Sequence, residues 1–161
     1  MKTSSTHKNP YINRQLTALG ILDRENWNID SCELDEYTAA HIVVRPDWII
    51  KHKTTGEHII VSYKRRYIGR RQHPTECEAL QISIEGIVLE RYFEVIHGFA
   101  PTIGMVILYG NNERRAIVYD ERDKVVIKAI AEKWARKHEK PITGNKLAQI
   151  ISGATFSNAC E

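Results

Sequence analysis

Short apolar, β-branched runs separated by polar turns occupy the chain between residues 41 and 64, and this pattern predicts strands. The predicted strands are 41–44, 47–52 and 58–64. The polar loop 53–57 joins the second strand to the third as a hairpin. Side chains of a strand point to alternate faces, so Ser62 and Lys64 are expected on one face and Tyr63 on the other.

The longest apolar pattern runs from Thr75 to about Ile96 and has a helical period. Apolar residues fall on both sides of this predicted helix: Leu80, Ile84, Ile87 and Val88 on one side, and Ile82, Leu89 and Phe93 on the other. A helix that is apolar on both sides is usually packed centrally. Gly98 and Pro101 are expected to end it.

The remaining elements follow from local signals. Asp30 and Glu33 have the spacing of a capping box, which predicts a short helix to about Ala40. The other predicted elements are helices at 11–22, 120–138 and 143–151, and strands at 102–109 and 114–119 around the turn Gly110-Asn111-Asn112. This order predicts an α/β fold with a mixed β-sheet flanked by helices.

The length of 161 residues, with 42% apolar and 27% charged residues, suits one globular domain. We expect a flexible N-terminus at 1–10, the domain at 11–153 and a C-terminal tail at 154–161. No apolar run is long enough to span a membrane, and the polar first residues lack a signal core, so a cytoplasmic protein without a membrane partner is expected.

Three scattered cysteines, Cys32, Cys77 and Cys160, suit reduced thiols in the cytosol better than a disulfide framework. No CxxC pair or Cys/His cluster is present in the sequence, so neither a structural zinc nor an iron–sulfur cluster is expected. The net charge of +3 is mild and argues only weakly for nucleic acid.

Candidate chemistry begins at the predicted hairpin. Asp47 opens the first strand of the hairpin, and Lys64 closes the second. A lysine at the end of a buried strand is costly unless an anionic group meets it. The hairpin brings Asp47 alongside, and this carboxylate together with a metal ion or a phosphate would provide that partner.

This layout resembles the PD-(D/E)XK (restriction-endonuclease-like) nuclease fold, and further motifs are similar to its RecB-like branch. These motifs are Glu78-Ala79-Leu80-Gln81, Gly86-Ile87-Val88-Leu89-Glu90-Arg91-Tyr92-Phe93, Gly98 and Gly104-Met105-Val106-Ile107-Leu108-Tyr109. The resemblance covers residues 41 to 120 and extends to the small CRISPR-associated RecB-like exonucleases. It does not include the four-cysteine cluster of some of these relatives.

The resemblance implies roles for several residues. Asp47 would be the primary ligand of Mg²⁺ or Mn²⁺, and Lys64 would stabilise the transition state or orient water. Ser62 stands where the family places Asp or Glu. Glu78, Gln81 and Glu85 lie within about 60° on the helix, so Glu78 would replace the missing acid, with Gln81 in the family's glutamine position.

Glu85 stands where the family has tyrosine; it is either another metal ligand or a sign of a degenerate site. Glu33 or Glu36 on the early predicted helix can supply a further acid. Each residue also has a structural interpretation: Asp47 as a turn cap, Glu78 as a first-turn acid and Lys64 as a solvated strand end.

The segment 64–73 concentrates positive charge directly after the predicted active strand. Arg65, Arg66, Arg70 and Arg71 are expected to hold a nucleic-acid backbone, and Arg114-Arg115 can extend this surface. Such a charge run is otherwise an ordinary solvated loop.

Together these features predict a divalent-metal-dependent deoxyribonuclease that acts on single-stranded DNA or DNA ends, as a homo-oligomer or within a larger nucleic-acid-processing complex. One alternative is a catalytically inactive protein of the same fold that binds nucleic acid or another protein. The other is an unrelated α/β module whose basic loop contacts an acidic partner.

Overall fold

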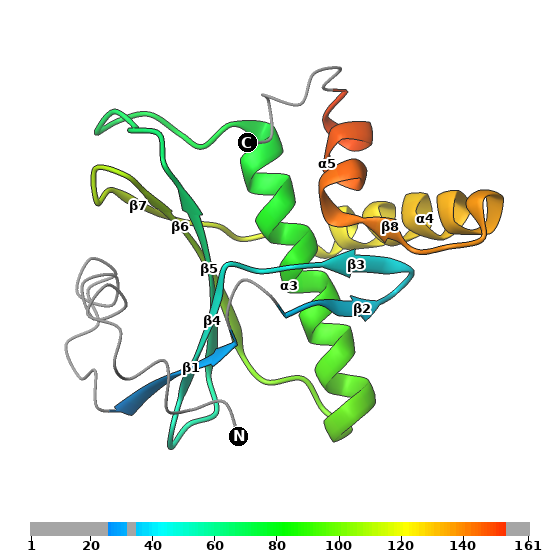
Figure 1. Cartoon of the computed structure of the whole chain (residues 1–161), viewed down its shortest axis with the longest axis horizontal. Coiled ribbons are helices and arrows are strands. Elements are labelled where there is room, and N and C mark those ends of the chain that lie inside the picture. Colours follow the sequence, from blue (N-terminus) through cyan, green and yellow to red (C-terminus); the bar gives the residue numbers. More distant parts are fainter. Residues whose placement is uncertain (1–25, 32–34, 154–161) are drawn as a thin grey trace.

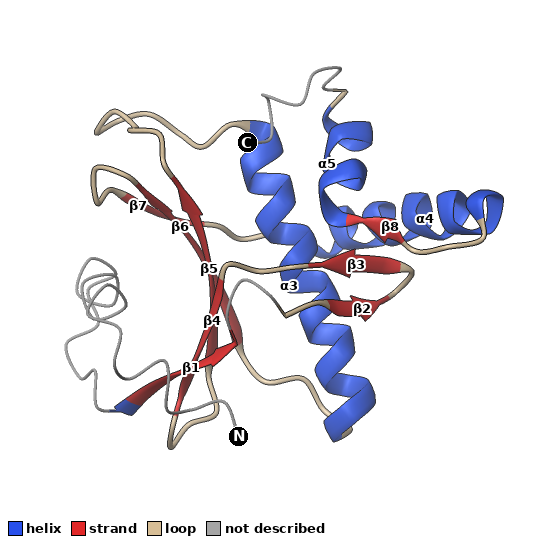
Figure 2. Ribbon diagram, viewed as in Figure 1, coloured by secondary structure: helices blue, strands red, loops and turns tan. Residues whose placement is uncertain are grey.

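The computed structural model describes residues 26–31 and 35–153, with only the backbone of residues 29–31. The predicted helix at 11–22 and the two terminal segments lie outside these residues. A five-stranded sheet lies on one side of a long central helix, α3 (Glu76–His97), and a smaller three-stranded sheet with two further helices lies on the other side (Figures 1 and 2). The predicted α/β class with a mixed sheet flanked by helices is therefore confirmed.

The five-stranded sheet has the order β1-β4-β5-β6-β7. Its strands are β1 (Trp27–Ser31), β4 (Trp48–His52), β5 (His58–Lys64), β6 (Ile103–Tyr109) and β7 (Arg114–Ala116). β1, β4 and β5 are antiparallel neighbours, whereas β6 lies parallel to β5 and pairs with β7 as a hairpin. A parallel pair needs a long crossover connection, and α3 provides it between β5 and β6.

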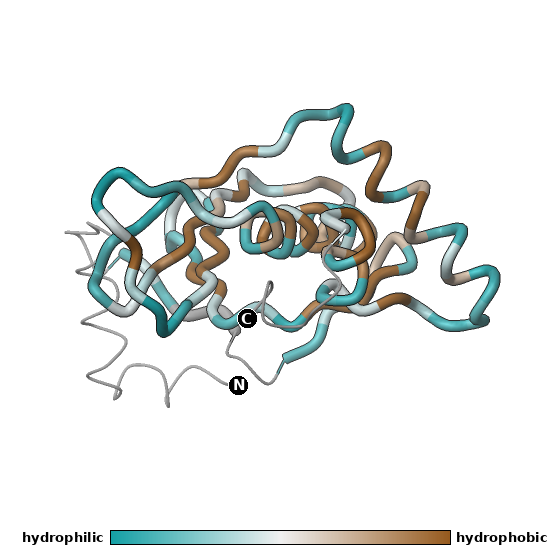
Figure 3. Tube along the Cα trace, turned by 90° about the horizontal axis from the view of Figure 1, so that it is seen from above, coloured by the Kyte–Doolittle hydropathy of each residue, from teal (hydrophilic) through white to brown (hydrophobic). Residues whose placement is uncertain are grey.

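Helix α3 is buried on both sides, as the sequence pattern predicts. Ile82 and Leu89 pack against Ile60 and Ile107 of the large sheet. Figure 3 shows hydrophobic residues gathered along the helix and the chain that surrounds it. At Gly86 the helix lies close to β6, because a Cβ at this position would lie 2.5 Å from the sulfur of Met105, whose side chain would have to shift.

The second layer covers the opposite face of α3, where Ile84 and Val88 pack into a separate cluster. It consists of β2 (Tyr37–Ala39), β3 (Ile42–Val44), β8 (Ile142–Thr143), α4 (Glu121–His138) and α5 (Gly144–Ser152). β3 pairs with β2 and, in parallel, with β8, so the second sheet joins residues about 100 positions apart. The predicted strand at 41–44 and the helices at 120–138 and 143–151 are confirmed.

Two expectations are wrong. The predicted short helix before Ala40 is replaced by strands on either side of residues 32–34, because pairing with β4 and β3 outweighs a local capping signal. Tyr37 packs edge-on against Tyr92 of α3, which holds β2 in the core. The expectation of reduced thiols is wrong for Cys77, which is disulfide-bonded.

No helix in residues 26–31 or 35–153 combines the length and the apolarity that a membrane crossing needs.

Candidate functional site

A pocket of about 610 Å³ opens where β4 begins and β5 ends. Antiparallel pairing of these strands places the start of one beside the end of the other, and α3 crosses above them. The pocket is lined by polar side chains from four parts of the chain, including Asp47, Ser62, Lys64, Gln81, Glu85 and Asn145. The structure therefore brings together Asp47, Lys64, Gln81 and Glu85, as the sequence predicts.

Asp47 is held in place by the end of the β4–β5 ladder. Its Oδ2 atom accepts a hydrogen bond of 2.7 Å from the backbone N–H of Tyr63. The preceding Pro46 is buried, which fixes the direction of the chain as it enters β4. The interpretation of Asp47 as a structural cap is thus correct in part, since its carboxylate both closes the strand pair and lines the pocket.

Lys64 belongs to a hydrogen-bonded chain that crosses the pocket. Its Nζ atom donates to Gln81 Oε1 at 2.9 Å, and Gln81 Nε2 donates to Asn145 Oδ1 at 2.7 Å. Asn145 lies in the first turn of α5, 64 residues after Gln81, and sequence reasoning missed it. No local signal could have found Asn145, because only the packing of α5 against α3 brings it here.

Glu85 is the unusual group of the pocket. Part of its side chain lines the pocket, whereas its Oε1 atom is buried and has no hydrogen-bond partner among the described residues. Burial and, to a smaller extent, the negative charge of Asp47 raise the pKa of the Glu85 carboxyl to about 8, although the positive charge of Lys64 opposes them. An unsatisfied buried carboxyl is costly, and such groups concentrate at functional sites.

Glu78, predicted as the second metal ligand, does not line this pocket. Arg66 donates to both of its carboxylate oxygens, at 2.8 and 2.6 Å, and Tyr109 Oη and the backbone N–H of Thr75 also donate to Oε1. Burial alone would raise the pKa of Glu78, but these hydrogen bonds outweigh burial and lower it. The geometry favours Glu85 over Glu78 as the partner of Asp47.

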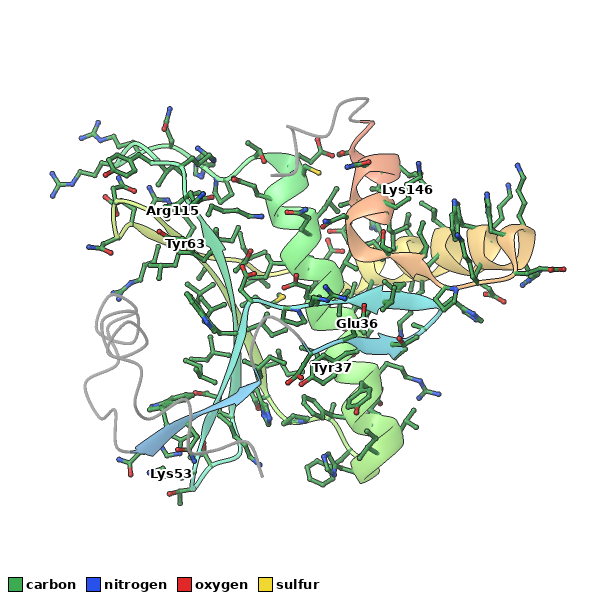
Figure 4. All side chains as sticks on the ribbon, viewed as in Figure 1. Glu36, Tyr37, Lys53, Tyr63, Arg115 and Lys146 are labelled. Atoms are coloured by element: carbon green, nitrogen blue, oxygen red, sulfur yellow. The ribbon has the colours of Figure 1, made fainter. Side chains whose placement is uncertain are left out.

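Glu36 (Figure 4) does not line this pocket. It is exposed, pairs with Arg45 at 2.7 Å, and lines a second hollow of about 360 Å³ that also reaches Gln81 and Glu85. Glu33 lies outside the described residues. Ser62 is buried on the same strand face as Lys64 and lines the pocket as a neutral group.

The arginines after β5 divide into two kinds. Arg66 is engaged by Glu78 and lies over the Tyr109 ring at 4.9 Å, so it has a structural partner although it lines the pocket. Arg65, Arg70 and Arg71 are exposed and form no ion pair within the described part of the chain. They remain candidates for binding phosphate groups.

The donor set fits a hard divalent cation. Magnesium is typically held by one or two carboxylates together with waters and substrate phosphates, and Asp47 and Glu85 supply two carboxylates. A cation bound by both carboxylates would offset the repulsion between them, and the unpartnered Glu85 oxygen would become one of its ligands. Within the described ranges no group of three or more His, Cys, Asp or Glu residues is arranged so that it could hold a metal ion, and the acids that line this pocket are Asp47 and Glu85.

No protein-family model, curated protein or solved structure matches this chain. The interpretation of the pocket therefore depends on its geometry and chemistry.

Proposed function

We propose that this chain is a divalent-metal-dependent deoxyribonuclease of the PD-(D/E)XK type that hydrolyses phosphodiester bonds in single-stranded DNA or at DNA ends. The observation that supports it is the convergence of Asp47, Lys64 and Glu85 on one pocket, where a buried Glu85 oxygen has no partner. Ser62 stands where this type of nuclease has an acid, and Glu85, rather than Glu78, supplies the missing carboxylate.

The order of the secondary structure also supports the proposal. Asp47 precedes β4, Lys64 ends the antiparallel neighbour β5, and α3 then leads to the parallel strand β6. This is the layout that the resemblance implies: an acid at a strand start, a lysine at the end of the next strand, and a packed helix. The glycine-to-tyrosine motif from Gly104 to Tyr109 occupies β6, as expected.

Mg²⁺ or Mn²⁺ bound by Asp47 and Glu85 would polarise a phosphate oxygen and acidify a water molecule. The positive charge of Lys64 would lie beside the same phosphate, on which negative charge develops as the phosphodiester bond breaks. Gln81 and Asn145 hold the Lys64 ammonium in that direction through hydrogen bonds. The exposed arginines after β5 would bind flanking phosphates.

The proposal is tested with end-labelled single-stranded and duplex DNA in Mg²⁺, in Mn²⁺ and in EDTA. Cleavage by the wild type should require metal, and Asp47→Asn, Glu85→Gln and Lys64→Met should each reduce it by about 100-fold or more. Glu94→Gln removes an exposed carboxylate from the same helix and should have no effect. Metal-independent cleavage, or variants that cut like the wild type, would overturn the proposal.

A second function, DNA binding without cleavage, is favoured by two features of the pocket. Ser62 is neutral, and among the described residues the pocket is lined by only two carboxylates, those of Asp47 and Glu85. This function predicts salt-dependent DNA binding by a wild type that does not cut in Mn²⁺. Calorimetric titration with Mn²⁺ would distinguish the two, since an active site should bind the metal and Asp47→Asn should abolish that binding.

A further inference from the structure

The loop after β5 is held rigidly by the β6–β7 hairpin. Asn111 bonds both backbone groups of Ile68, accepting from its N–H at 3.3 Å and donating to its carbonyl at 2.8 Å. Arg115 donates to three carbonyl oxygens of the loop, at positions 69, 70 and 72. Arg115 (Figure 4) thus orders this loop, and its expected part in nucleic-acid binding stays a prediction.

Two neighbouring side chains of this loop differ strongly in solvent exposure. Ile68 is 2% exposed and anchors the loop in the core, whereas the preceding Tyr67 is 74% exposed. The Tyr67 ring lies beside Gly110, where its Cε1 atom would be 3.2 Å from a Cβ placed on that glycine. A rigid loop thus presents an aromatic ring to solvent at a defined place.

Arginines precede and follow Tyr67 in this loop. Arg65, Arg70 and Arg71 are exposed on the same loop. Arg65 also lines the pocket of Asp47 and Glu85. Adjacent Cα atoms are 3.8 Å apart, so the Cα atom of Tyr67 lies within about 8 Å of that of Arg65, which itself lines the pocket. The ring and the site can therefore contact neighbouring nucleotides of one strand.

An exposed aromatic ring among arginines suits an unpaired base. Every base has a face that can stack on the ring, while arginines bind the flanking phosphates regardless of sequence. In an intact duplex both faces of an internal base are already stacked on neighbouring bases. The Tyr67 ring can therefore stack only on a base of a single strand or of a frayed end.

We infer that Tyr67 is a base-stacking platform that binds a single-stranded DNA segment beside the pocket, with Arg65, Arg70 and Arg71 on its phosphates. The inference deepens the proposed nuclease function by assigning its substrate class to a residue. It is tested by binding in EDTA, so its outcome is independent of whether the chain cuts DNA.

The experiment measures fluorescence anisotropy of a labelled oligothymidine and of a hairpin-capped duplex of the same length. Tyr67→Ala should weaken single-strand binding by about 5- to 100-fold, the range of one stacked base, and change duplex binding by less than about twofold. Tyr67→Phe keeps the ring and should bind like the wild type. Circular dichroism confirms that each variant is folded.

The matched control is Phe99→Ala. Phe99 is also an exposed aromatic residue, at 67%, but it lies beyond the opposite end of α3, a helix of 22 residues or about 33 Å. It should not affect binding. The double variant Arg70→Gln, Arg71→Gln should bind both the single strand and the duplex more weakly, and its binding should depend less on salt concentration.

Three results would overturn the inference: a wild type that binds no single strand, a Tyr67→Ala variant that binds as well as the wild type, or equal losses for single strand and duplex. Failure of the nuclease proposal alone has a different signature. DNA would stay intact in Mg²⁺ and Mn²⁺ while the Tyr67→Ala defect in binding persisted.

Discussion

Glu78 in the first turn of α3 and Glu85 two turns later lie on the same side of the helix but in opposite chemical situations. The carboxylate of Glu78 receives hydrogen bonds from Arg66, Thr75 and Tyr109, and these lower its pKa. Glu85 has a buried oxygen without a partner, and its pKa is raised to about 8. Hydrogen bonds to a buried carboxylate favour its charged form, whereas a buried carboxyl without a partner favours its protonated form.

The comparison also explains why the two ends of the site behave differently. Around Glu78 the donors and acceptors satisfy one another's hydrogen bonds, and these bonds hold the loop that follows β5. Around Glu85 the negative charge of Asp47 raises the pKa of the carboxyl, and the positive charge of Lys64 lowers it. The first region holds its carboxylate in a complete set of hydrogen bonds, and the second is where the proposed function places a cation.

The largest expected effect is the loss of catalysis in Glu85→Gln. If Glu85 is a metal ligand, cleavage should fall by about 100- to 1,000-fold, or about 3–4 kcal/mol in activation free energy, with no loss of thermal stability in EDTA. Single-turnover cleavage in Mn²⁺ measures the rate. A Glu78→Gln variant that is folded yet loses catalysis as strongly would reverse the roles assigned to the two glutamates.

The second prediction concerns pH. Between pH 4.5 and pH 8 the folded chain keeps a proton on Glu85 that the unfolded chain has released. Wild-type stability therefore falls relative to Glu85→Gln as the pH rises through this window, by up to about 1.4 kcal/mol per pH unit. Urea denaturation in EDTA across the window measures the difference. Parallel stability profiles would contradict the burial assigned to this carboxyl.

The third prediction concerns the stability of the loop anchor. Glu78→Gln leaves the Arg66 guanidinium without its carboxylate and should lower the free energy of unfolding by about 2 kcal/mol, less than for a fully buried pair because Arg66 is partly exposed. Arg66→Met should cost a similar amount, and the double variant should cost less than the sum. Denaturant unfolding of all four proteins completes this cycle, and additive losses would show that the pair is not coupled.

The smallest effect is expected for Asn145→Ala. Removing this acceptor frees the Gln81 amide, so Lys64 loses its orientation but not its charge. We expect cleavage to fall about 5- to 10-fold, or about 1 kcal/mol, with DNA binding in EDTA unchanged. Asn145→Asp keeps the accepting oxygen and should retain more activity than the alanine variant. Equal losses in both would indicate that the hydrogen bond does not matter.

Local patterns predicted most of the elements because each depends on residues close in sequence. The strands at 42–44, 48–52 and 58–64 and the helix α3 carry their periodicity within a single segment. The failure before Ala40 has the opposite cause. A capping-box spacing describes a few residues, whereas the strands β1 and β2 are stabilised by partners in β4 and β3 that no local window contains.

The candidate site divides in the same way. Sequence alone placed Asp47 and Lys64 at adjacent strand ends and put Glu78, Gln81 and Glu85 on one side of a helix, because both follow from backbone periodicity. Only the tertiary structure decided which glutamate faces Asp47, since that depends on where Arg66 and Tyr109 meet the helix. Asn145 likewise enters the pocket through packing across the fold, where hydrogen bonds join residues that sequence order keeps far apart.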